Sequence, residues 1–163
     1  MSATLLREVE GERTQYEVAM NIHYSVRLHG RHCRLFERLR KITSFLTVLA
    51  GTAVIGALKT ESTALGVALG LVVTVLGTAN LVWDFGGSAR AHEGQRKKYN
   101  GLLSASELTV AEADRKRSVI ANDDPGEIDA LRVVALNDIY RTFGHGDLLE
   151  REPFASKFMR FIA

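Results

Sequence analysis

The feature that most constrains this chain is an apolar stretch, residues 42–83, with only two charged side chains, Lys59 and Glu61. These two charges divide it into runs of 17 residues (42–58) and 22 residues (62–83). As helices, at about 1.5 Å per residue, the runs would measure about 25 Å and about 33 Å. The hydrocarbon core of a bilayer is about 30 Å thick. The stretch therefore predicts a two-transmembrane helical hairpin with a polar tip.

Charge is distributed unevenly along the chain. Of the 40 Asp, Glu, Lys and Arg residues, two lie in residues 42–83 and 38 lie in the other 121 residues. Two buried helices of a soluble bundle are the alternative, but half-exposed elements would show a regular alternation of polar residues over so long a run. We therefore expect an all-α membrane protein, with N- and C-terminal cytoplasmic helical segments at residues 1–41 and 84–163.

Basic residues flank both ends of the apolar stretch. Residues 27–41 contain six Lys or Arg and one acid, and residues 90–98 contain four Lys or Arg and one acid. Because Lys and Arg near span ends are retained in the cytoplasm, both termini should be cytoplasmic and the tip should face outward. The side chains expected at the level of the lipid headgroups are Arg38, Arg40, Lys41, Trp83 and Arg90.

Four arginines before the hairpin, at positions 27, 31, 34 and 38, recur at steps of four, three and four residues. This spacing places them on one face of a helix. For Arg27 and Arg31 we expect a solvated face that pairs with acids of a neighbouring helix. For residues 38–41 we expect contact with headgroups.

Further helices are expected after the hairpin, over residues 88–108 and 109–121. A third should start at Asp124, because Asp at the N-cap, Pro at the first helical position and Glu at the third favour a helix start. It should run to Phe143 and stop at Gly144, since glycine is favoured just past a helix end.

The tail has aromatic residues at helical spacing. If helical, it would place Phe154, Phe158, Phe161 and Ile162 on one face. A helix this short is marginal alone and needs a surface to pack on. The bilayer interface and the cytoplasmic helices are both open as that surface.

The second apolar run carries a stripe of small and polar residues, at positions 63, 66, 70, 74, 77, 80 and 84. Gly66, Gly70 and Gly77 predict close helix packing, since small residues let membrane helices approach each other. A second hypothesis is that Thr74, Asn80 and Asp84 line a conduction path in an oligomer, because polar groups within a membrane require protein partners or water.

The sequence contains no convincing catalytic, cofactor or metal site, and we do not expect an enzyme or a nucleic-acid partner. His29, His32 and Cys33 could approach one metal ion, with His23 as a distant fourth ligand. A zinc site usually requires four well-placed ligands, and neighbouring arginines disfavour a cation. We therefore predict no metal.

Short motifs on both sides of the hairpin resemble one bacterial family. They are Ile22-His23-Tyr24-Ser25, Lys98-Tyr99-Asn100-Gly101-Leu102-Leu103, Ile120-Ala121-Asn122-Asp123-Asp124-Pro125 and Ala135-Leu136-Asn137-Asp138. With the two adjacent spans, roughly residues 15–145 resemble the SLATT family. Its members are bacterial two-transmembrane domains found beside nucleotide-signalling and nucleotide-sensing modules in conflict systems.

The resemblance implies an effector of antiviral defence that perforates the bacterial inner (plasma) membrane once a nucleotide-sensing or signalling protein encoded nearby detects an intruder. It carries over no catalytic residues. Such a pore requires a homo-oligomer, because two spans per chain cannot enclose a path. The alternative is a non-conducting, membrane-anchored scaffold whose cytoplasmic helices recruit a soluble partner.

Overall fold

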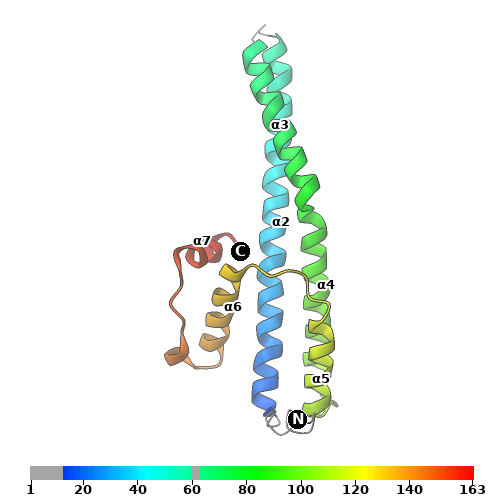
Figure 1. Ribbon diagram of the computed structural model, residues 1–163, viewed down its shortest axis with the longest axis vertical. Coiled ribbons are helices and arrows are strands. Elements are labelled where there is room, and N and C mark those ends of the chain that lie inside the picture. Colours follow the sequence, from blue (N-terminus) through cyan, green and yellow to red (C-terminus); the bar gives the residue numbers. More distant parts are fainter. Residues whose placement is uncertain (1–12, 60–62) are drawn as a thin grey trace, which may run out of the picture.

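The computed structural model describes residues 13–59 and 63–163, and these ranges contain helices and no strand (Figure 1). The all-α class is therefore confirmed, while the tip at residues 60–62 lies outside the described residues. The elements are α2 (Gln15–Lys59), α3 (Thr63–Trp83), α4 (Phe85–Ser104), α5 (Val110–Ala121), α6 (Asp129–Thr142), the 3-10 helix η1 (Gly146–Leu148) and α7 (Phe154–Ile162).

Helix α2 runs through 45 residues without a break, joining the polar N-terminal segment to the first apolar run. No proline precedes Pro125, so nothing in this segment removes a backbone donor or blocks the helix. Its N-terminal half packs against α4, and its C-terminal half packs against α3 (Figure 1). The change from polar to apolar sequence near residue 42 therefore leaves the backbone uninterrupted.

The apolar hairpin, which we define as residues 42–59 of α2 together with α3, exposes most of its large apolar side chains in the part of it that the structure describes. Its two helices are long and apolar enough to cross a membrane. No residue of α3 is buried, and large side chains such as Phe45, Leu71 and Val75 are exposed. The described residues therefore leave this apolar surface without a protein cover, whereas a soluble bundle would bury it.

Helices α3 and α4 follow one another with a single non-helical residue between them, Asp84. Its φ of 34° lies in the left-handed region, and its carboxylate accepts a hydrogen bond from the Gly87 N–H at 2.8 Å. The carboxylate lies so close to Gly87 that an added Cβ there would collide with it. Asp84 is thus the N-cap of α4, a position at which Asp is strongly favoured.

The remaining helices form a polar bundle around the N-terminal half of α2, with two apolar clusters. One cluster joins α2 to α6 and to the C-terminal end of α7, through Leu28, Leu35, Leu131, Ala135 and Ala163. The other joins α2 to α4 and α5, through Val18, Ile22, Tyr99 and Leu102. Both clusters use α2, so this helix is the centre of the bundle.

The expected helix start at Asp124 is wrong. Helix α6 begins at Asp129, with Ile128 at the N-cap and no side-chain cap. The Asp124 carboxylate instead accepts a hydrogen bond from the Tyr99 hydroxyl at 2.8 Å, so it does not cap a helix. The end of the helix agrees with expectation within one residue, because α6 stops at Thr142 and Gly144 has a φ of 81°.

Candidate functional site

Three histidines between α2 and α4 are among the most deeply buried polar groups of the bundle. His29 and His32 on α2 are 0 % exposed, and His92 on α4 is 1 % exposed. The Nδ1 atoms of His29 and His92 lie 3.0 Å apart, and the rings of His32 and His92 stack with centroids 4.4 Å apart. Because a close Nδ1–Nδ1 contact holds a single proton, one of these two rings donates and the other accepts.

An aspartate and a tyrosine extend the histidine cluster. His29 Nε2 lies 3.2 Å from Asp124 Oδ1, a contact at ion-pair distance without hydrogen-bond alignment. The Tyr99 hydroxyl donates to the other oxygen of Asp124, and the Tyr99 ring stacks on His29 at 5.5 Å. His92, His29, Asp124 and Tyr99 therefore form one connected polar chain across α2, α4 and the segment before α6. We call these four residues together with His32 the histidine network.

His32 links α2 to the start of α6 and has a defined tautomer. Its Nδ1 lies 2.9 Å from the Leu28 carbonyl oxygen, which can only accept, so Nδ1 carries the proton. The Ile128 N–H donates to His32 Nε2 at 2.8 Å, so Nε2 presents its lone pair. A second proton on His32 would displace this bond from the N-cap residue of α6.

Burial opposes charge within the histidine network. It lowers the pKa of His92 to about 3, with further contributions from the neighbouring His32 and His29. Burial also lowers the pKa of His32, against the opposing effect of its bond to the Leu28 carbonyl. For Tyr99, burial and the adjacent Asp124 raise the pKa. Both shifted histidines and Tyr99 are therefore neutral at pH 7, and His32 and His92 resist protonation as the pH falls.

The hypothetical metal site has a different arrangement in the structure. His29 and His32 turn toward His92, whereas the Cys33 thiol approaches Glu93 Oε2 at 3.7 Å. His23 is exposed and packs edge-on against Phe143. No group of three or more potential ligands that could hold a metal ion occurs among the described residues. The sequence drew attention to His29 and His32 but not to His92. His92 meets them only when α4 packs against α2.

The predicted packing glycines do not share one environment. Gly66 faces α2, where an added Cβ would lie 3.9 Å from the Ala57 Cβ. Nothing in the described chain lies within 4 Å of a Cβ added at Gly70 or Gly77. Within one chain, therefore, only Gly66 borders the neighbouring helix, and Gly77 is exposed.

The candidate pore residues lie on the surface of the apolar hairpin. Thr74 and Asn80 are exposed, and the Thr74 hydroxyl donates to the Gly70 carbonyl at 2.9 Å within α3. Asp84 is exposed at the junction with α4, where its carboxylate also caps that helix. The sequence pattern did not reveal this capping role, because it depends on the left-handed backbone at Asp84.

The arginine face of α2 holds the C-terminal helices. The Arg31 guanidinium pairs with Asp138 of α6, as expected for this face. Arg34 donates to the Ala163 carbonyl at 2.6 Å, and Arg38 donates to the Phe161 carbonyl at 3.3 Å. The other side chains expected at headgroup level, Arg40, Lys41, Trp83 and Arg90, are exposed. Arg38 therefore has a protein partner besides any headgroup it contacts.

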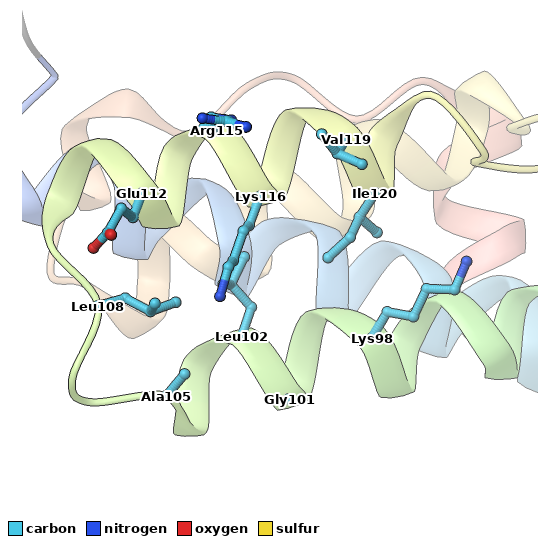
Figure 2. A pocket seen from close by; sticks show the side chains of 10 residues that line it. All are labelled: Lys98, Gly101, Leu102, Ala105, Leu108, Glu112, Arg115, Lys116, Val119 and Ile120. Atoms are coloured by element: carbon cyan, nitrogen blue, oxygen red, sulfur yellow. The ribbon is translucent and has the colours of Figure 1, made fainter.

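A groove of about 620 Å³ separates α4 from α5. Leu102 of α4, Leu108 of the connecting segment and Ile120 of α5 supply apolar surface, and Lys98 and Lys116 supply positive charge. Figure 2 shows Lys116 reaching from α5 toward α4. The groove is open and combines apolar walls with a mainly basic rim.

No protein-family model, curated protein or solved structure matches this chain.

Two substitutions of Asp84, between α3 and α4, distinguish the effect of its charge from its role as the N-cap of α4. Asp84→Ala should lower the free energy of unfolding by about 1–2 kcal/mol, because it removes the N-cap acceptor. Asp84→Asn should cost less than half as much, since Asn also caps helices and tolerates a left-handed backbone. Denaturant titration of the two purified proteins in detergent measures the difference. Equal losses in both variants would contradict the capping role, because both remove the charge.

Proposed function

We propose that this chain is a membrane effector of a bacterial conflict system, which acts as an oligomeric pore that disrupts the inner membrane when triggered. The proposal rests on the resemblance of its motifs to the SLATT family and on the architecture of the apolar hairpin. The observation that carries it is the exposed surface of the apolar hairpin, which no other part of the described chain covers. This hairpin bears polar groups, and its helices lead directly into a folded polar bundle.

Exposure of the apolar hairpin supports the membrane location. Burying one large aliphatic or aromatic side chain is worth about 1.5–3 kcal/mol, so leaving many of them in water would be costly. Both helices satisfy their backbone groups internally, as spanning segments must. The basic residues at the bundle end of the apolar hairpin favour a cytoplasmic bundle and an outward tip.

The surface of α3 supports assembly into a pore. Thr74, Gly77 and Asn80 are exposed in the single chain, so they are available to further copies. In lipid, small residues allow close approach of helices, and polar side chains require partners or water. A ring of α3 helices would supply both, with the Asp84 carboxylates at the cytoplasmic mouth attracting cations.

Triggering requires the polar bundle to act on the apolar hairpin. The unbroken α2 and the one-residue junction at Asp84 provide two direct connections between them. From the family resemblance, we propose that the trigger is a nucleotide-sensing or signalling protein encoded nearby, which contacts the bundle.

The pore is tested by ion flux from proteoliposomes containing the purified protein. Thr74→Val and Asn80→Leu should each reduce flux several-fold while leaving insertion and assembly intact, since both make α3 more apolar. Thr52→Val is the matched control, because Thr52 is exposed on the other apolar helix and bonds to the Val48 carbonyl at 2.9 Å in the same way. Flux through the Thr52→Val protein should equal that of the unmodified protein.

The groove between α4 and α5 favours a second candidate function, a membrane-anchored scaffold. Its apolar walls and its Lys98 and Lys116 side chains suit an acidic, partly apolar segment of a soluble partner. Under this alternative the unmodified protein stays electrically silent in liposomes with its neighbouring partner and ligand present. Function is then lost by changes in the groove or in α6, and Thr74→Val has no effect.

A further inference from the structure

Helix α7 has two different faces. Met159 and Ile162 pack against the apolar cluster formed by α2 and α6, and Ser156 is buried beside them. On the opposite side, Phe154 is 86 % exposed, Phe158 is 54 % exposed and Phe161 is 84 % exposed. The packed face holds the helix in place, so its three aromatic rings are presented outward on a fixed support.

The position of α7 places this aromatic face next to the start of the apolar hairpin. Arg38 and Arg34 donate to carbonyls at the C-terminal end of α7. They precede the apolar run at residue 42 by four and eight residues, or about 6 Å and about 12 Å along the helix axis. Figure 1 shows α7 lying crosswise to α2, at the end of α6 that is nearer to α3. A helix in this place lies parallel to the plane of a bilayer crossed by α2.

The level of Arg38, the nearer of these two contacts, falls within the thickness of a headgroup layer. The hydrocarbon core measures about 30 Å and the whole bilayer about 40–45 Å, which leaves about 5–8 Å for the headgroups on each side. Interfacial helices bury their apolar face about 5–10 Å into the boundary between headgroups and acyl chains. The contact with Arg38, about 6 Å before the apolar run, therefore holds the C-terminal end of α7 near the level of the headgroups, where aromatic side chains are favoured.

Charge around α7 favours the same partner. The helix contains Lys157 and Arg160 and no acid. Arg160 pairs with Glu152, whereas Lys157 is exposed, as are Arg40 and Lys41 on the adjacent turns of α2. Exposed Lys and Arg near a cytoplasmic membrane surface are attracted to its anionic lipids.

We propose that α7 is an interfacial helix that docks Phe154, Phe158 and Phe161 into the cytoplasmic leaflet of the bilayer that the apolar hairpin crosses. The inference rests on the membrane location in the proposed function, but not on pore formation. Docking of α7 attaches the polar bundle to the membrane at a further point, in addition to the apolar hairpin. Since α7 binds α2 through Arg34 and Arg38, it also resists tilting of α2 toward or away from the leaflet.

Depth-dependent fluorescence quenching tests this arrangement. A Cys33→Ser background carries single cysteines at Phe154, Phe161, Val75 or Val119, each labelled with an environment-sensitive fluorophore in anionic vesicles. Val75 of α3 and Val119 of α5 are exposed controls, for the membrane core and for water. Labels at Phe154 and Phe161 should be quenched by brominated lipid to similar extents and be protected from aqueous iodide several-fold relative to Val119.

Each alternative outcome has a distinct meaning. If the Val75 label contacts lipid while the α7 labels are as accessible to iodide as Val119, the hairpin spans the membrane and the docking of α7 is refuted. If α7 labels escape both quenchers, another protein surface covers the helix and the inference is also overturned. If the Val75 label is accessible to iodide and untouched by brominated lipid, the membrane location itself fails.

Discussion

Lowering the pH from 7 to 5 is expected to destabilise the polar bundle by about 2 kcal/mol through His92 alone. In the unfolded chain His92 titrates near its ordinary value of 6.5, whereas in the bundle its pKa is about 3. Between these values the unfolded state binds a proton that the folded state excludes, so stability falls as the pH falls. His32 contributes in the same direction, because burial lowers its pKa too.

Denaturant midpoints measured in detergent at several pH values test this expectation. His92→Asn is the informative variant, because the amide can still pair with His29 but does not titrate. Its midpoint should change less between pH 7 and pH 5 than that of the unmodified protein, by the equivalent of about 2 kcal/mol. If the two proteins show the same slope, the pH dependence does not arise from His92.

Truncating Tyr99 is expected to cause the largest loss of stability of any substitution considered for the bundle. Tyr99 is fully buried, packs with Val18 and Ile22 of α2, and donates to Asp124. Tyr99→Ala should cost about 3–5 kcal/mol, since it leaves a cavity the size of an aromatic ring. Tyr99→Phe should cost about 1–3 kcal/mol, because it keeps the ring and removes only the donor to a half-buried carboxylate.

The Tyr99 pair is measured by denaturant titration, with Asn100→Ala as the control. Asn100 is the next residue on α4 and is exposed, so its truncation should change stability by less than about 0.5 kcal/mol. Equal losses for Tyr99→Ala and Tyr99→Phe would mean that the hydrogen bond to Asp124, and not packing, holds α4 to the segment before α6.

The sequence predicted those helices and contacts that depend on residues close together in the chain. The gap in charge between residues 42 and 83 marked two long apolar helices, and the helix expected over residues 109–121 matches α5, where Thr109 and Glu112 form a capping box. The spacing of the arginines along α2 correctly predicted that Arg31 pairs with an acid of another helix, which is Asp138 of α6. Hydrophobicity, caps and spacing act within a few residues and are readable in the sequence.

Features set by contacts between distant residues could not be predicted. The sequence predicted Asp124 as an N-cap. In the structure its carboxylate accepts a hydrogen bond from Tyr99, 25 residues earlier, and α6 begins only at Asp129. His29 and His32 were considered as metal ligands and rejected, but their pairing with His92 was not predicted. His92 lies 63 residues from His29 and faces it only once α4 has packed on α2. The left-handed backbone of Asp84 likewise depends on how α3 and α4 meet.

Helix α2 has a mechanical consequence. Its 45 residues form one continuous helix of about 68 Å, which links the polar bundle to the apolar hairpin without a break. A rotation of about 10° around its midpoint would displace each end by about 6 Å in opposite directions. On the neighbouring side the helix is interrupted at Asp84, so α3 and α4 are separate helices that both pack against α2. A push on the bundle end of α2 would therefore reach the apolar end of the same helix in the opposite direction.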